Sequence, residues 1–116
     1  MLERDIERKL GEHLKALGCL YYKFVSPGQR GVPDRIVICP DGKVVFVELK
    51  QPKGLVATIQ DVQHARLVRN GQMVVLVWNM IQAEEFTDWV RVHHTRPVTS
   101  GAVWTFGAGE EDNNEP

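Results

Sequence analysis

The residues best suited to chemistry lie in two short segments, 31–34 and 47–50. The first is Gly-Val-Pro-Asp and the second is Val-Glu-Leu-Lys. Glu48 and Lys50 are two residues apart, so on a strand their side chains leave the same face. A carboxylate beside an ammonium near the end of an otherwise apolar strand is either a structural ion pair on a solvated face or part of a functional site.

The turn between these segments decides whether Asp34 can join Glu48. Residues 40–42, Pro-Asp-Gly, fit a three-residue hairpin loop with glycine in the left-handed position. That register sets Asp34 opposite Glu48, with the Cβ atoms about 5 Å apart on one face. A two-residue Asp-Gly turn would instead set Asp34 opposite Leu49, on the wrong face. We favour the first register because proline suits its place in that turn.

Two carboxylates this close repel each other unless a positive charge lies between them. A divalent cation that prefers oxygen ligands, Mg²⁺ or Mn²⁺, fits this requirement, and Lys50 would complete the charge balance. The residues therefore predict a metal site at the pair formed by Asp34 and Glu48.

The cysteines and histidines predict no other metal site. Cys19 and Cys39 form no CxxC motif, so we expect buried, reduced thiols and a cytoplasmic protein. The histidines are scattered, and we expect solvated or core side chains rather than ligands at His13, His64, His93 and His94.

The hydrophobic pattern predicts a mixed sheet flanked by helices, in the α/β or α+β class. Apolar residues at helical spacing predict helices over residues 2–17, 59–70 and 82–93. Short apolar runs predict strands over residues 20–25, 35–39, 44–50, 73–78 and 102–106. Glycine and proline predict loops over residues 26–33 and 52–58.

The charge is unevenly distributed along the 116 residues. The formal net charge is −1, but residues 1–70 hold 12 Lys and Arg against 8 Asp and Glu, a balance of +4. Residues 71–116 hold 2 against 7, a balance of −5. We expect one domain over residues 1–106, an acidic disordered tail over 107–116, and neither a membrane span nor a signal peptide.

The ordered set of motifs resembles the PD-(D/E)XK nuclease superfamily, and in finer detail its VRR-NUC branch. The features that carry the resemblance are Gly31 to Asp34, Gly42, Glu48 to Lys50, Gln60, Leu67 to Gly71 before Val74 to Trp78, and Glu7 in the first helix. The match covers about two-thirds of the chain, roughly residues 3–78. It implies a restriction-endonuclease-like core and metal-dependent hydrolysis of a DNA phosphodiester.

The resemblance also implies roles for individual residues. Asp34, Glu48 and the backbone carbonyl of Leu49 would hold the metal. Lys50 would orient or deprotonate the attacking water and stabilise the developing negative charge.

Two residues outside the hairpin complete the set implied by the resemblance. Glu7 would reach the metal through water or bind a second ion, although it is more simply a solvated helix residue, like Glu3 and Glu12. Gln60 would position Lys50 or the water, with Gln63 as an alternative.

The implied substrate is DNA, read by backbone and shape. Basic residues near the site could contact phosphates or serve only as solubilising charge: Lys23, Arg30, Arg35 and Lys53. Small stand-alone relatives resemble Holliday-junction resolvases that work as homodimers, and suggest a phage or prophage origin. The third helix, with Ile81, Phe86, Trp89 and Val90, and the segment 103–106 could form the dimer surface or complete the core. The alternatives to an enzyme are a non-catalytic DNA-binding module and a protein-interaction domain.

Overall fold

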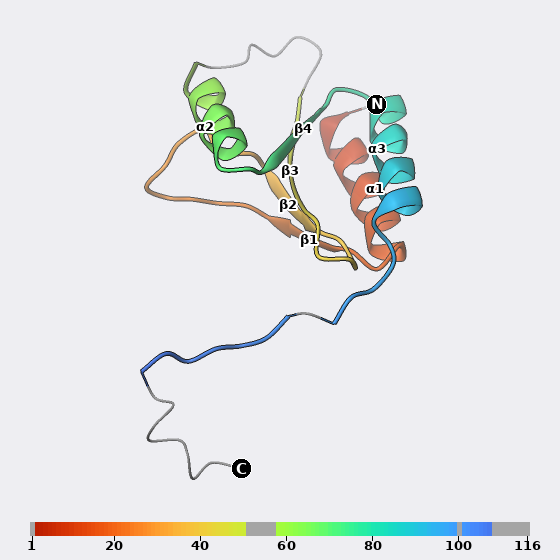
Figure 1. The fold of residues 1–116 in the computed structure, drawn as a ribbon. Coiled ribbons are helices and arrows are strands. Elements are labelled where there is room, and N and C mark those ends of the chain that lie inside the picture. Colours follow the sequence, from red (N-terminus) through yellow and green to blue (C-terminus); the bar gives the residue numbers. More distant parts are fainter. Residues whose placement is uncertain (1, 51–57, 100, 108–116) are drawn as a thin grey trace.

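One four-stranded sheet flanked by helices makes up the fold in a computed structural model, which describes residues 2–50, 58–99 and 101–107 (Figure 1). The elements follow the order α1 (Glu3–Ala16), β1 (Leu20–Lys23), β2 (Arg35–Ile38), β3 (Val44–Leu49), α2 (Thr58–Arg69), β4 (Met73–Val77) and α3 (Met80–His93). The sheet order is β1-β2-β3-β4, with antiparallel pairs up to β3 and a parallel pair between β3 and β4. The predicted mixed α/β class is confirmed.

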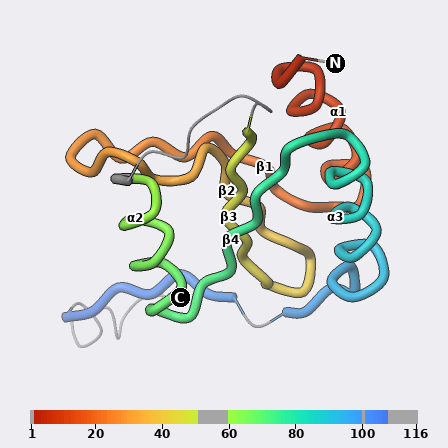
Figure 2. Tube along the Cα trace, turned by 90° about the horizontal axis from the view of Figure 1, so that it is seen from above, coloured from red at the N-terminus to blue at the C-terminus, as the bar shows by residue number. Residues whose placement is uncertain are grey.

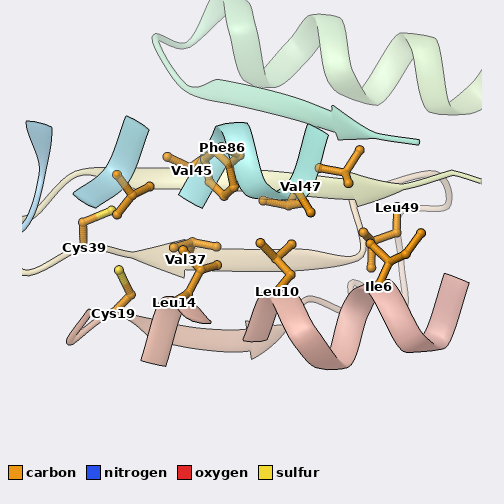
Figure 3. Packing of buried hydrophobic residues seen from close by; sticks show 13 residues of the cluster. Ile6, Leu10, Leu14, Cys19, Val37, Cys39, Val45, Val47, Leu49 and Phe86 are labelled. Atoms are coloured by element: carbon orange, nitrogen blue, oxygen red, sulfur yellow. The ribbon is translucent and has the colours of Figure 1, made fainter. Parts of the chain in front are cut away.

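The helices lie on both faces of the sheet. In Figure 2, α1 and α3 lie on one side of the strands and α2 lies on the other, beside β4. The core fills the space between the sheet and α1 with α3, where Leu10, Leu14 and Val37 are fully buried (Figure 3). Glu48 alternates with the core residues Val47 and Leu49 along β3, so it faces α2.

The predicted hairpin turn is confirmed in detail. The N–H of Cys39 donates to the carbonyl of Lys43 at 2.8 Å, and the N–H of Gly42 donates to the carbonyl of Cys39 at 2.8 Å. Gly42 has a φ of 93°, in the left-handed region that favours glycine. Arg35 pairs with Val47 in the resulting register.

A side-chain contact holds this turn against the end of α3. The Asp41 carboxylate lies 2.6 Å from Nδ1 of His94, and it also accepts the backbone N–H of Lys43 at 3.0 Å. The hydrogen bond from Lys43 and then the contact with His94 lower the pKa of Asp41. The His94 ring packs 4.5 Å, between centroids, from that of Trp89, so His94 has a structural role.

Several predicted boundaries shift, and one predicted strand is wrong. α3 begins at Met80 because the side chain of Asn79 accepts the N–H of Gln82 at 2.9 Å and caps the helix. Residues 102–106 form no strand, because this segment leads away from the sheet and gains no backbone partner there (Figure 1). Residues 52–57 of the predicted loop and 108–116 of the predicted tail lie outside the described residues.

The two candidate dimer surfaces have different surroundings. Phe86 and Val90 of α3 are buried in the core. These two residues therefore complete the core and do not form a dimer surface. Ile81, Trp104 and Phe106 remain exposed, by 68%, 75% and 89%. Among the described residues, no helix is long and apolar enough to cross a membrane.

Candidate active site

Three side chains form a buried polar cluster at the end of β3: Glu48 of β3, Lys50 directly after it, and Gln60 of α2. The Nζ atom of Lys50 donates to Oε1 of Gln60, and Nε2 of Gln60 donates to Oε2 of Glu48 at 3.2 Å. The ammonium of Lys50 lies 3.6 Å from the same Glu48 oxygen. Glu48 and Lys50 are only 4% and 6% exposed, so this ion pair does not lie on a solvated face.

Asp34 lies against the same end of β3. Its Oδ2 atom accepts the backbone N–H of Leu49 at 3.1 Å, while its backbone carbonyl accepts the N–H of Phe24 at 2.8 Å. Continuing the register of β2 and β3 by one residue sets Asp34 opposite Glu48, as the turn predicts. The hairpin thus brings Asp34, Glu48 and the backbone of Leu49 together.

The electrostatics of Glu48 fit a cation at this place. Burial, and then the negative charge of Asp34, raise the pKa of Glu48 to about 7, against the lowering effect of Lys50. The second carboxylate oxygen of Glu48, Oε1, is buried and has no hydrogen-bond partner among the described residues. A buried carboxylate oxygen without a donor needs a partner, and a divalent cation would supply it.

The donor set suits a hard cation. No group of three His, Cys, Asp or Glu side chains that could hold a metal occurs in the described part of the chain. A cation between Asp34 and Glu48 would therefore take its other ligands from backbone carbonyls, such as that of Leu49, and from water. Mg²⁺ commonly binds in this way, through one or two carboxylates while it keeps several waters.

Glu7 lies apart from this cluster. Its carboxylate forms an ion pair with Arg35, whose guanidinium also lies 5.6 Å from the centre of the Tyr21 ring. Asp34 and Arg35 are consecutive and leave opposite faces of the sheet, and α1 covers the face of Arg35. The described contacts therefore bring Asp34, Glu48, Lys50 and Gln60 together and pair Glu7 with Arg35 instead.

Comparisons with known proteins found one similar protein and one similar solved structure. No family model matches the chain. The phage protein "Putative nuclease p44", from Acyrthosiphon pisum secondary endosymbiont phage 1, is 45% identical over 75 residues, which is 65% of this chain and 81% of that protein. A solved structure of a VRR_NUC domain superposes with a TM-score of 0.69 at 30% identity, over 74% of this chain and 94% of that one.

The chain belongs to the VRR-NUC family. The resemblance inferred from Gly31 to Asp34 and Glu48 to Lys50 is thereby confirmed at the level of family and fold.

The basic residues predicted to contact DNA have different environments in this VRR-NUC domain. Lys23 and Arg30 are exposed. The side chain of Arg35 is only 16% exposed because it is engaged by Glu7. Lys53 lies outside the described residues.

Sequence reasoning missed one contact near the VRR-NUC site. Gln29, in the loop before Asp34, accepts hydrogen bonds from Gln63 at 3.1 Å and from Arg66 at 3.5 Å, and so ties this loop to α2. No local pattern indicates that contact.

Proposed function

We propose that this chain is a metal-dependent nuclease that hydrolyses phosphodiester bonds in DNA. The observation that carries the proposal is the buried cluster of Glu48, Lys50 and Gln60 beside Asp34, with Oε1 of Glu48 unpartnered among the described residues. A relative named as a nuclease at 45% identity supports the same activity. In a purely structural ion network, an unpaired buried carboxylate oxygen would only lower the stability of the fold.

In this proposal Asp34, Glu48 and the carbonyl of Leu49 hold Mg²⁺ or Mn²⁺. When bound, such a cation polarises a phosphate oxygen and lowers the pKa of a coordinated water. The ammonium of Lys50 orients the attacking water and stabilises negative charge that develops on the phosphate. Gln60 fixes Lys50 through its carbonyl oxygen and Glu48 through its amide, so both catalytic groups keep their geometry.

Glu7 takes an outer role in this proposal. Its partner Arg35 directly follows Asp34 in the chain, so the Glu7 carboxylate lies near the same end of the sheet. To act on the metal through water or to hold a second ion, its carboxylate must reach around this end of the sheet from the face opposite to Glu48. Arg35 competes with the metal for this carboxylate.

We propose branched DNA, such as a Holliday junction, as the substrate and a homodimer as the active form. The exposed cations of Lys23 and Arg30 are available to contact DNA phosphates without reading bases. The exposed apolar side chains of Ile81, Trp104 and Phe106 provide surface for a second copy. Two symmetric sites would then cut two strands of one junction.

The test is cleavage of labelled Holliday-junction, flap, splayed and linear DNA with Mg²⁺, Mn²⁺ or EDTA. The wild-type protein should cut only with metal, and symmetric paired nicks near a junction would support a resolvase. Glu48→Gln and Lys50→Met should bind DNA without cutting it, whereas Lys15→Met, on the exposed surface of α1, should cut normally. DNA binding without cleavage by the wild-type protein would favour the non-catalytic module, and the absence of both would favour a protein-interaction domain.

Light scattering at several protein concentrations tests the proposed dimer. A monomer that still cuts junctions in pairs would reject the dimer and leave the nuclease proposal intact.

A further inference from the structure

The outer edge of β4 is unpaired in the part of the chain that the structure describes. β4 is the last strand of the sheet, and its partner is β3. The carbonyl of Val77 accepts the N–H of Lys50, directly after β3, at 2.8 Å, so the backbone groups of Val77 point toward β3. Because this direction alternates along a strand, the N–H and C=O groups of Val74 and Leu76 point outward. An exposed row of such groups can pair with a strand of another chain.

An apolar groove follows this edge between β4 and α3. Its volume is about 370 Å³. β4 lines the groove with Met73 and Val75, which pack toward the core, and with Leu76, whose side chain leaves the opposite face of the sheet. Because residues from both faces line one groove, the groove includes the edge of the strand itself. α3 lines it with the half-buried ring of Trp89 and the exposed carboxylate of Glu85, so it suits an apolar side chain with a polar donor, such as tryptophan.

Residues 102–106 form an apolar segment that gains no strand partner among the described residues. Their sequence, Ala-Val-Trp-Thr-Phe, is rich in the β-branched and aromatic residues typical of strands. Val103, Trp104 and Phe106 are all exposed. The rings of Trp104 and Phe106 stack with their centroids 6.4 Å apart, so these two residues share one side of the segment, as they would in a strand.

The strand edge and the segment belong to one chain but do not meet in it. The N–H of Val98 donates to the carbonyl of Pro40 at 3.4 Å, which holds the chain at the hairpin turn. From there the segment leads away from the sheet (Figure 1). A segment that leaves its own domain can reach a second copy, and a reciprocal exchange uses each edge and each segment once. Such an exchange closes at two copies.

We propose that residues 102–106 of one copy add as a strand to the outer edge of β4 in a second copy, with the rings of Trp104 and Phe106 in the groove. The backbone groups of Val74 and Leu76 then gain partners. This inference rests on the proposed function in one respect, because a homodimer is there the active form. The contact itself requires neither metal nor DNA.

The first test is light scattering of the full chain and its variants at several protein concentrations. The wild type should be a dimer. Leu76→Lys places a charge at the strand edge and should weaken the dimer about 30-fold or more, whereas Val62→Lys, at a side chain of similar exposure on α2, should not. Thermal unfolding identifies variants that do not fold. A monomeric wild type, or unchanged dimer affinity in folded Leu76→Lys, would overturn the proposal.

The second test removes the aromatic rings of the segment. The double variant Trp104→Ser, Phe106→Ser should weaken the dimer to a similar extent, because buried aromatic side chains dominate interfaces. Ile81→Ser is the matched control, since Ile81 is an exposed apolar residue of α3 that does not line the groove. Dissociation by Ile81→Ser and not by the double variant would assign the dimer to another face and reject the segment.

Mixing the two deficient variants tests the reciprocal exchange. Leu76→Lys retains an intact segment, and the double variant Trp104→Ser, Phe106→Ser retains an intact edge, so a mixed pair contains one complete contact. The mixture should form heterodimers at a concentration at which each variant alone is monomeric, and native mass spectrometry detects them. Absence of the heterodimer would reject the exchange.

Hydrogen exchange at the Val74 and Leu76 amides identifies what covers the edge. Both amides should exchange about 10-fold or more slowly in the wild-type dimer than in the double variant. Protected amides in a monomeric wild type would mean that the chain's own segment covers the edge, and would reject the second copy. A dimer that cuts no DNA would refute the nuclease proposal alone, and a monomer that cuts DNA would refute this contact and leave the nuclease proposal intact.

Discussion

The Asp34 carboxylate accepts the backbone N–H of Leu49 at 3.1 Å. This contact joins the residue before β2 to the last residue of β3, across the open end of the hairpin. The other carboxylate oxygen of Asp34 has no hydrogen bond among the described residues. Asp34 therefore has two separable roles, one in holding the strand ends together and one in the proposed metal site.

Asp34→Asn and Asp34→Ala should separate these two roles. Asn keeps an oxygen that can accept the Leu49 N–H but lacks the charge, so folding should be retained while affinity for Mn²⁺ falls. Ala leaves that N–H without its partner and should also cost about 1–2 kcal/mol of unfolding free energy. Urea unfolding and Mn²⁺ titration measure the two effects. Unchanged Mn²⁺ affinity in Asp34→Asn would remove Asp34 from the proposed ligand set.

Gln60→Ala should lower kcat about 100-fold, because both Lys50 and Glu48 lose a partner that fixes their side chains. Gln63→Ala is the matched control, since the Gln63 amide binds Gln29 in the loop before Asp34. Single-turnover cleavage of junction DNA compares the two. A larger loss in Gln63→Ala would favour Gln63 for the positioning role.

The stability of the metal-free protein should contain a contribution from Glu48 that decreases as the pH rises. Burial and Asp34 raise the Glu48 pKa from 4.5 to about 7 in the folded state. Because the folded-state pKa is the higher one, this contribution is fully present below pH 4.5 and is lost as the pH rises through 7. It amounts to about 3 kcal/mol. Urea unfolding from pH 5 to 8 in EDTA measures it.

Glu48→Gln should remove this part of the pH profile, and the difference between the two profiles reports Glu48 itself. Glu12→Gln, on the exposed surface of α1, is the control. Saturating Mg²⁺ at pH 8 should stabilise wild type and leave Glu48→Gln unchanged. Equal stabilisation of both proteins would place the cation elsewhere.

Both cysteines should resist alkylation in the folded protein. Burial raises the pKa of Cys39 to about 12 and also raises that of Cys19, so little reactive thiolate forms near pH 8. The two side chains are at the same end of the core (Figure 3), where Cys19 is 4% exposed and Cys39 is 3% exposed. Mass spectrometry after iodoacetamide treatment should find modification only once denaturant is added. Rapid modification without denaturant would contradict this burial.

Gly42→Ala should destabilise the protein by about 1–2 kcal/mol, because a φ of 93° is strained for a residue with a Cβ atom. Steric contact is not the cause, since the nearest atom to an added Cβ lies 4.0 Å away. Gly28→Ala, where an added Cβ meets nothing within 4 Å and φ is not positive, should be nearly neutral. Thermal unfolding of both variants checks this difference, and equal destabilisation would contradict it.

Residues that are close together in the sequence were sufficient to predict the hairpin that carries the candidate site. Pro40, Asp41 and Gly42 determine the turn, the turn determines the register, and the period of two residues along a strand sets Asp34 and Glu48 on one face. The regular spacing of Ile6, Leu10 and Leu14 likewise determined which face of α1 is buried. These inferences succeed because each depends on residues that are close in the chain. The predicted strand at 102–106 failed because apolar composition does not reveal whether a neighbouring strand is present.

Only the tertiary structure decided which distant residues meet. Gln60 reaches Glu48 and Lys50, while Gln63 turns to the loop before Asp34, and helical spacing alone left both possible. Glu7 pairs with Arg35 because α1 packs on the face of the sheet opposite to Glu48. The raised pKa of Glu48 also arises from burial under α2 and from the nearby charge of Asp34. Such contacts depend on how helices dock on a sheet, and that is determined by packing between segments far apart in the chain.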